Sequence, residues 1–188
     1  MIQIIKKTTP LLNPSFIKPL LIHYKHNEIE RTWEAVKSHD SVSVLLYNTD
    51  LDSFVLVRQF RAPVLLNNEK DGVMYEICAG LVDKELSLEH IVHEEILEEC
   101  GYEVPLSNIV KITSFYTSVG ISGAKQTLYY AQIDESMKRN EGGGLEDERI
   151  EVIYLKKEEA KKFILDESYQ KTPGLIMSIY WFFDNIDL

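Results

Sequence analysis

The stretch HEEILEECGY, residues 93–102, places four glutamates within six residues. On a helical wheel at about 100° per residue, Glu95 and Glu99 fall inside the apolar arc that is predicted to be buried. That arc is formed by Ile91, Leu88, Val92, Ile96 and Cys100. Their spacing of four residues sets the two carboxylates above one another on one helix face. Ionised carboxylates in that arrangement repel each other, and removing each from water costs several kcal/mol.

A bound cation would offset both costs, and the helix itself supplies none. No lysine or arginine occurs between Leu86 and Val104. Hard divalent cations prefer oxygen ligands, and Mg²⁺ commonly takes one or two carboxylates together with substrate phosphates. The pattern therefore predicts a metal site. The alternative is that the helix end extends past the core and its glutamates are simply solvated.

The histidines and cysteines on or near this helix are interpreted as structural residues and not as metal ligands. His90 and His93 fall on the far side of the wheel from the glutamates, so we expect surface histidines. Cys78 and Cys100 are expected to be small core residues.

The elements around this helix can be read from the hydrophobic pattern. Ser87 is a suitable N-cap, and Gly101 falls where a glycine ends a helix. Strands are predicted at 41–48 and 53–60 (a hairpin around TDLD), 73–80, 109–116, 125–133 and 150–155, with a strand pair within 15–36. Helices are predicted at 156–165 and from Thr172 as N-cap and Pro173 through Asn185. This alternation predicts an α/β fold with a mixed sheet and helices on both faces.

The segment 134–149 is long and acidic, and it contains three consecutive glycines at 142–144. Loops of this length are either irregular excursions or mobile elements of an active site. Both interpretations stay open from the residues alone.

Composition limits the partners and the compartment. The 188 residues carry a formal net charge of −10, and no basic cluster offers a surface for nucleic acid or an anionic membrane. No apolar run is long enough to span a bilayer. The two cysteines form no disulfide framework, and residues 1–16 lack the apolar region of a signal peptide, so we expect a cytoplasmic protein.

The segment Gly80–Tyr102 resembles the signature of the Nudix hydrolases, G-x5-E-x7-R-E-U-x-E-E-x-G-U, in which U is aliphatic. The matching positions are Gly80, Glu95, Ile96, Glu98, Glu99 and Gly101. Two positions depart from it: Leu86 stands in place of the first glutamate, and Glu94 in place of the arginine. Segments such as RTWEAVKSHDSVSVLLYN, FVLVRQFRAPV and CAGLVD resemble the branch that cleaves ADP-ribose and UDP-sugars, and UDP-glucose pyrophosphatases are most similar.

The resemblance implies an α/β/α sandwich, residues 41–188, preceded by a small β-rich dimerisation segment, residues 1–40, in an intertwined homodimer. It implies Mg²⁺, or Mn²⁺ in its place, held by Glu95, Glu99 and the carbonyl of Ala79, with Glu98 in support. Glu148 would complete the metal site or act as the base on the attacking water. Glu146 competes with Glu148 for that role.

The resemblance also implies a substrate site. Arg61 would bind the pyrophosphate, and Trp33, flanked by Glu34, would stack on the nucleobase from the partner subunit. Glu76 and the turn at Gly120 would line the site. Three of these assignments have a structural alternative. Trp33 would be an ordinary core or interface aromatic, Arg61 would pair with an acidic residue, and Glu146 and Glu148 would belong to a solvated acidic loop.

The implied reaction is Mg²⁺-dependent hydrolysis of a nucleotide sugar, with UDP-glucose giving UMP and glucose 1-phosphate. ADP-ribose, giving AMP and ribose 5-phosphate, is the rival substrate. A degenerate module that binds nucleotide without cleaving it is the second alternative, suggested by Leu86 and Glu94.

Overall fold

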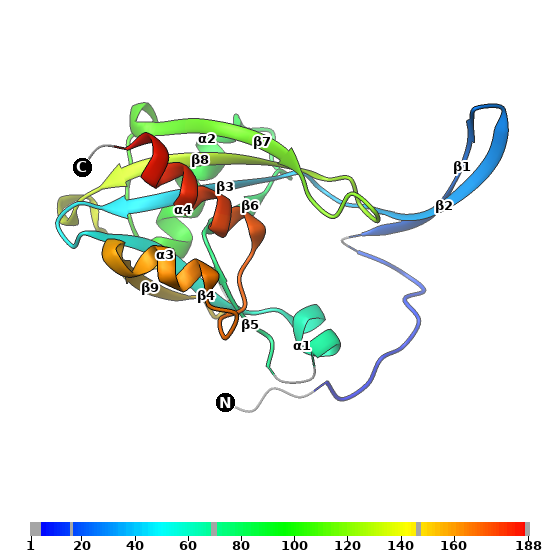
Figure 1. The fold of residues 1–188 in the computed structure, drawn as a ribbon, viewed down its shortest axis with the longest axis horizontal. Helices are drawn as coiled ribbons and strands as arrows, with labels where there is room; N and C mark the ends of the chain where they lie inside the picture. The colour runs from blue at the N-terminus through cyan, green and yellow to red at the C-terminus, as the bar shows by residue number, and fades with distance from the viewer. Residues whose placement is uncertain (1–4, 16, 69–70, 146–147, 187–188) are drawn as a thin grey trace.

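The computed structural model describes residues 5–15, 17–68, 71–145 and 148–186. Within these ranges a mixed seven-stranded sheet forms the body, and a separate two-stranded sheet precedes it (Figure 1). The strands of the body are β3 (Ser41–Asn48), β4 (Ser53–Phe60), β5 (Val73–Glu76), β6 (Cys78–Leu81), β7 (Ile109–Tyr116), β8 (Lys125–Ile133) and β9 (Glu151–Lys156). The strand order is β5-β4-β3-β8-β7, with β6 also paired to β3 and β9 to β4. Only the β3–β8 pairing is parallel among the described pairs.

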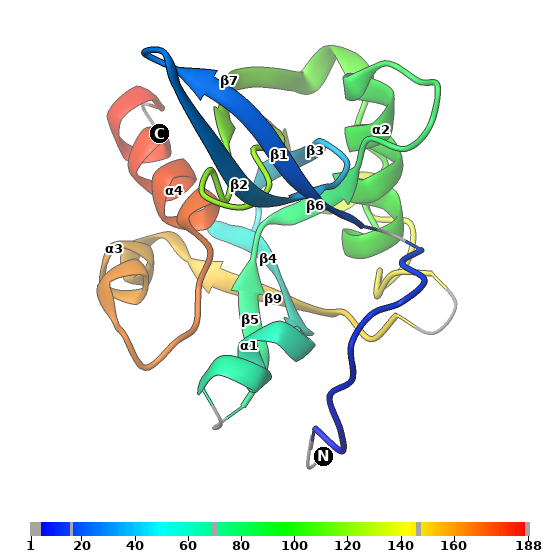
Figure 2. The same cartoon turned by 90° about the vertical axis from the view of Figure 1, so that its right-hand side faces the viewer.

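Helices cover both faces of the sheet. The helical elements are α1 (Ala62–Asn68), α2 (Leu88–Glu95), α3 (Lys157–Leu165) and α4 (Pro173–Asn185), with a π-helix η1 (Ile96–Cys100) and 3₁₀ turns η2 (Leu106–Asn108) and η3 (Glu135–Met137). Figure 2 shows α2 on one side of the strands and α3 and α4 on the other. The predicted α/β sandwich is confirmed.

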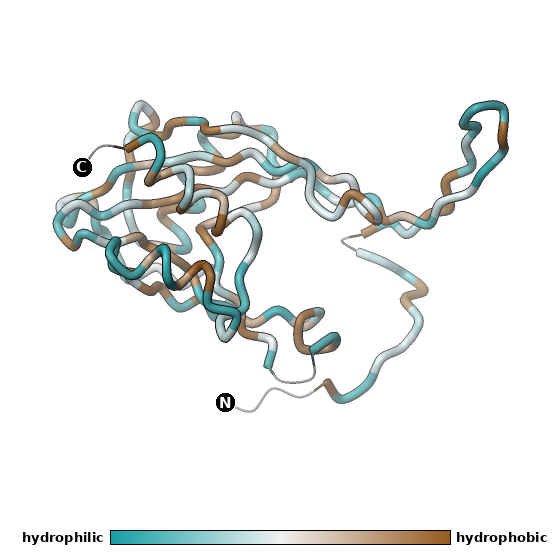
Figure 3. The backbone as a smooth tube through the Cα atoms, in the orientation of Figure 1, coloured by the Kyte–Doolittle hydropathy of each residue, from teal (hydrophilic) through white to brown (hydrophobic). Residues whose placement is uncertain are grey.

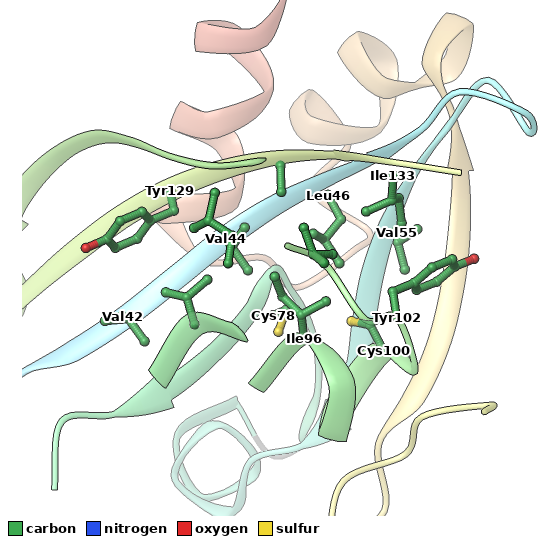
Figure 4. Packing of buried hydrophobic residues seen from close by; sticks show 14 of the residues in the cluster. Val42, Val44, Leu46, Val55, Cys78, Ile96, Cys100, Tyr102, Tyr129 and Ile133 are labelled. Atoms are coloured by element: carbon green, nitrogen blue, oxygen red, sulfur yellow. The ribbon is translucent and has the colours of Figure 1, made fainter. Parts of the chain in front are cut away.

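The central strand β3 is apolar on both faces because a core lies on each side of it. Val44 and Leu46 pack in the cluster beneath α2, together with Cys78 and Ile96 (Figure 4). Leu45, between them in the sequence, points to the opposite cluster beneath α3 and α4. Strand alternation thus divides one continuous apolar run between two cores.

Most predicted elements are confirmed. The hairpin turns between Asn48 and Ser53, and β7 and β8 have the predicted bounds. The Ser87 side chain accepts a hydrogen bond from His90 N–H and caps α2, and Thr172 caps α4 in the same way.

The prediction of one strand at 73–80 is wrong. The segment changes partner at Ile77: β5 pairs with β4, whereas β6 pairs with β3 and continues through Gly80 to Leu81. The cause is that β3 and β4 pair only over three residues each and then diverge. Each diverging strand takes half of the segment, and the gap between them becomes the floor of a cavity.

The helix after Ser87 was predicted as one α-helix, but its last turn is the π-helix η1. It ends at Gly101, which adopts a left-handed φ of 80° that glycine accepts without strain. The short helix α1 was not predicted, because Leu65 is its one buried residue and a seven-residue helix with so little burial leaves no periodic signal.

The predicted strand pair near the N-terminus is confirmed as β1 (Lys18–His26) and β2 (Ile29–Lys37). This hairpin projects away from the body (Figure 1), and Val36 N–H donates to Ile121 O at 2.8 Å at its base. The division of the chain into units 1–40 and 41–188 stays a prediction. In the part of the chain described, none of the helices has the length and apolar character needed to cross a membrane.

Candidate active site

A cavity of about 520 Å³ opens where β3–β6 and β4–β5 diverge. Its walls combine the acidic end of the α2–η1 helix, the end of β4, strands β5 and β6, and the loop before β9. The predicted site residues among its lining are Arg61, Glu76, Ala79, Glu95, Glu98, Glu99 and Glu148. Seven predicted positions, separated by up to 87 residues in sequence, therefore share one cavity.

Glu99 is the most enclosed of these carboxylates, with 6 % of its surface exposed. Its Oε2 accepts a hydrogen bond from Ala79 N–H at 3.0 Å, which fixes the side chain over β6. Burial raises the pKa of Glu99 to about 8; Ala79 N–H and the Cys78 thiol oppose this, while the charges of Glu95 and Glu148 add to it.

Glu95 lies against the backbone of β6. A Cβ added at Gly80 would come within 2.0 Å of Glu95 Oε1, so only glycine leaves room for this carboxylate. Burial raises the pKa of Glu95 to about 7, and repulsion from Glu98 adds to the effect. The wheel placed Glu95 and Glu99 on the buried face, and the structure buries Glu99 and leaves Glu95 half-buried.

The triple glycine holds the C-terminal end of this helix. Gly143 N–H donates to Glu99 O at 2.9 Å, and Gly144 N–H donates to Glu98 O at 3.0 Å. A Cβ added at Gly142 would lie 2.2 Å from Glu99 O. These glycines satisfy carbonyls that a helix end leaves without partners, so this part of the loop caps the acidic α2–η1 helix.

Arg61 and Glu76 face each other across the cavity wall. Arg61 Nε donates to Glu76 Oε1 at 2.9 Å, and Nη2 donates to Oε2 at 2.8 Å. This bidentate pair raises the pKa of the guanidinium and fixes its plane. The alternative of an acidic partner is confirmed for Arg61, and its role in binding a pyrophosphate stays a prediction.

Glu148 is exposed at the edge of the cavity. Its Oε2 accepts a hydrogen bond from Leu145 N–H at 3.0 Å, within a short turn of the loop. Glu146, its competitor for the base role, lies outside the described residues.

Trp33, Glu34 and Gly120 lie elsewhere. Trp33 is 52 % exposed on the hairpin, and its Nε1 donates to Gly120 O at 2.9 Å. The structure thus brings Trp33 and Gly120 together, but none of the three belongs to the described walls of the cavity.

Sequence reasoning missed Lys84. Its Nζ lies 2.6 Å from Glu94 Oε2, and the residue lines the cavity. The helix carries no cation of its own, as its sequence shows, but the loop before it folds back and supplies one. The signal was Glu94 itself, an acid where the signature has a base, which called for a cation nearby.

The two histidines differ from each other. His90 is exposed and its Nδ1 pairs with Ser87 Oγ, as expected of a surface residue. His93 is half-buried, and its Nδ1 lies 2.7 Å from Val104 O, so the surface interpretation is wrong for it. Neither is among the described lining of the cavity.

The donor set suits a hard divalent cation. The carboxylates of Glu95, Glu98, Glu99 and Glu148 offer only oxygen. Burial raises the pKa of Glu95 and Glu99, and a bound cation would oppose that effect by favouring the ionised forms. Among the described residues no three acidic, histidine or cysteine side chains already converge as a metal site. Oxygen ligands for a cation line the cavity, but one carboxylate oxygen of Glu99 and one of Glu148 accept hydrogen bonds from backbone N–H groups.

The fold and cavity together define an α/β enzyme domain that presents buried carboxylates and an arginine to a small ligand. The chain belongs to the Nudix family, because the family described as NUDIX domain matches residues 37–173. As a Nudix hydrolase, it has relatives that are nucleotide-sugar pyrophosphatases.

The chain is 38 % identical to the uridine diphosphate glucose pyrophosphatase NUDT14 of Bos taurus, over 89 % of this chain and 88 % of that protein. It is 33 % identical to the NUDT14 protein of Mus musculus, over 91 % and 90 % of the two chains. It is 40 % identical to a GDP-mannose pyrophosphatase of Pectobacterium atrosepticum, over 64 % and 61 %. The membership implied by the signature is confirmed.

Proposed function

We propose that this protein hydrolyses the pyrophosphate bond of a nucleoside diphosphate sugar, with UDP-glucose giving UMP and glucose 1-phosphate. The observation that carries the proposal is the pair of enclosed carboxylates, Glu95 and Glu99, in one cavity with Arg61. The similarity to UDP-glucose pyrophosphatases along about nine-tenths of the chain supports the choice of substrate.

Arg61 binds the diphosphate in this proposal. Two of its nitrogens, Nε and Nη2, are held by Glu76, so we assign the phosphate contact to Nη1. The bidentate pair keeps the guanidinium oriented before substrate arrives, which lowers the entropy lost on binding. Lys84 adds a second positive charge at the cavity wall.

Mg²⁺, or Mn²⁺ in its place, would be held by Glu95, Glu99 and the carbonyl of Ala79, with Glu98 in support. When bound, the ion neutralises the diphosphate charge and lowers the pKa of a coordinated water. Glu148 Oε2 takes the proton from the attacking water, after it exchanges Leu145 N–H for that water. Glu146 is the competing base.

We infer a homodimer and a cytoplasmic location as parts of the same proposal. The exposed hairpin supports the dimer, because two strands alone are marginally stable in water. In this proposal Trp33, which lies outside the described walls of its own cavity, stacks on the nucleobase bound by the partner subunit. Two free cysteines, both buried, suit a reducing compartment.

The test is product analysis with purified protein. UDP-glucose, ADP-ribose and GDP-mannose are each incubated with Mg²⁺ and with EDTA, and products are resolved by anion-exchange chromatography. We expect UMP and glucose 1-phosphate, UDP-glucose as the best substrate, and no turnover in EDTA. A higher kcat/KM for ADP-ribose would select the alternative substrate.

The carboxylates are tested by single substitution. Glu95→Gln and Glu99→Gln keep the shape of each side chain and remove its charge. Losing even an outer partner of a metal ligand costs about 10- to 100-fold, so we expect a loss of more than about 100-fold in kcat/KM. Full activity in both variants would contradict the assignment. Saturable nucleotide binding without cleavage by the native protein would favour the non-hydrolytic module.

A further inference from the structure

A second cavity, of about 320 Å³, lies next to the acidic cavity. The two share three wall residues, Glu76, Ala79 and Gln126. The second cavity continues from these residues toward the N-terminus of α4 and the end of β7, where Thr172, Gly174 and Phe115 line it. A ligand whose diphosphate lies beside Glu76 and Ala79 therefore has a connected space for one of its ends.

Ser43 gives the wall of this second cavity a buried hydroxyl whose hydrogen-bonding capacity is unused among the described residues. The residue lines the cavity and is 1 % exposed, and its Oγ has no hydrogen-bond partner among the described residues. It lies on β3 directly opposite Ala79 of β6. A buried hydroxyl without a partner destabilises the folded protein, and a ligand that hydrogen-bonds it recovers that loss.

The position of Ser43 is unusual for its strand. Leu45 and Tyr47, on the same face of β3, pack in the apolar core beneath α4. An aliphatic residue at 43 would extend that core without a polar cost. The serine instead ends the apolar face where the cavity begins.

The other walls combine polar groups with aromatic rings. Gln126 holds Ser41 Oγ with its Nε2 at 3.2 Å, and its Oε1 would lie 3.3 Å from a Cβ added at Gly174, which places the amide beside α4. Phe115 and Tyr116 are the aromatic residues of the lining. Hydroxyl and amide groups beside aromatic rings suit a sugar, which presents hydroxyls at its edge and C–H groups on its faces.

We propose that this cavity, the Ser43 chamber, binds the hexose of the nucleoside diphosphate sugar, and that Ser43 is a specificity-determining residue that hydrogen-bonds a sugar hydroxyl. This inference rests on the proposed function and assigns the hexose end of its substrate. The size agrees, because 320 Å³ lies at the lower end of the range for ligand pockets, about 300–1,000 Å³. The nucleoside, the larger end, then leaves the acidic cavity in the other direction.

Binding of analogues that no hydrolase can cleave tests the chamber separately from catalysis. UDP-glucose and UDP methyl ester are both prepared with a methylene group in place of the oxygen between the phosphorus atoms. Calorimetry with Mg²⁺ gives the ratio of the two Kd values for the native protein and for Ser43→Ala. We expect the native protein to prefer the glucose compound, and Ser43→Ala to reduce that preference about five- to tenfold, as expected for one lost hydrogen bond.

Ser178→Ala is the matched control. Ser178 is also buried beneath the sheet, but its Oγ donates to Leu175 O at 2.9 Å within α4 and lies outside the described lining of the chamber. It should keep the native ratio. The 2-, 3-, 4- and 6-deoxy forms of the glucose compound then identify the hydroxyl, because its removal should weaken binding to the native protein but not to Ser43→Ala.

An unchanged ratio in Ser43→Ala, or no preference for the glucose compound in the native protein, would overturn the chamber assignment. These results do not depend on turnover. If the native protein binds the glucose compound through Ser43 but cleaves no nucleotide sugar, the proposed function fails and the chamber stands. If the protein cleaves UDP-glucose but Ser43→Ala leaves the ratio unchanged, the proposed function stands and the chamber assignment fails.

Discussion

Glu94 stands where the Nudix signature has an arginine, and Lys84 lies 2.6 Å from it. Position 94 thus carries a negative charge where the signature has a positive one, and Lys84 supplies the positive charge beside it. Both side chains are well exposed, at 46 % and 37 %, so the pair contributes little stability by itself, about 0.2–1 kcal/mol. Its position on the cavity wall gives it a larger effect on the site than on the fold.

We expect Glu94→Arg to bring a like charge against Lys84 and to lower both stability and kcat/KM. The double variant Lys84→Glu/Glu94→Arg should recover the stability, with a coupling of less than about 1 kcal/mol in urea unfolding. A single Glu94→Arg variant that is more active than the native protein would show instead that the signature arginine is what this site lacks.

A pH effect follows from the pKa values of Glu95 and Glu99. Both are raised above the ordinary value of 4.5, to about 7 and about 8. Their contribution to stability is thus complete below pH 4.5 and is lost as pH rises through 7 to 8. In EDTA we expect the native Tm to fall over that window, relative to Glu95→Gln/Glu99→Gln, by differential scanning calorimetry.

Addition of Mg²⁺ at pH 8 should restore the Tm of the native protein, because a ligand that binds only the folded state stabilises it. The double variant lacks both carboxylates and should not respond. An equal response to Mg²⁺ in the two proteins would contradict the placement of the ion at these residues.

Among the elements, the acidic α2–η1 helix depends on a loop from far along the chain. The η1 turn ends at Gly101, and its exposed carbonyls are satisfied by Gly143 and Gly144. Close approach of the two backbones requires Gly142, since a Cβ there would meet Glu99 O. The acidic helix and the segment before Glu148 are therefore held as one unit.

Gly142→Ala should break this contact. Gly142 has φ 67°, and an alanine there pays both backbone strain and a steric clash, so we expect a loss of about 2–5 kcal/mol in stability. Gly123→Ala is the matched control: its φ is 68°, but an added Cβ meets none of the described atoms within 4 Å. Its cost should be strain alone, about 1–2 kcal/mol. If both variants lose the same free energy of unfolding in denaturant, the close approach at Gly142 does not contribute to stability.

At the scale of the whole molecule, the β1–β2 hairpin exposes apolar side chains far from the core. Ile22 and Trp33 face each other across the two strands and are 42 % and 52 % exposed. Figure 3 shows apolar stretches along this hairpin, outside the body. A surface of this kind on a two-stranded sheet favours association with a second chain.

We expect Ile22→Glu to convert the proposed dimer to a monomer, measured by light scattering after size-exclusion chromatography. Trp33 of each chain would then lose its place beside the partner's cavity, so kcat/KM should fall too. Thr32→Glu adds the same charge on the other face of the hairpin and should leave the mass unchanged. A native protein that is already monomeric would contradict the dimer.

The sequence by itself determined the layers of the fold and the acidic helix. Strand alternation, the Ser87 and Thr172 caps and the glycine at 101 are local signals, and most of the elements that they predict are present, the single strand at 73–80 being the exception. Helical periodicity also placed Glu95 and Glu99 on one face of the helix. The spacing alone left open whether that end of the helix is solvated, and the structure buries Glu99 and half-buries Glu95.

The walls of the cavity could be seen only in the tertiary structure. The change of partner at Ile77, the reach of Lys84 to Glu94 and the glycines over the helix end all depend on contacts between distant segments. The same holds for Ser43, whose unpartnered hydroxyl is visible only when its neighbours are in place. Local patterns specify faces and ends of elements, whereas the space between elements is set by how their backbones diverge.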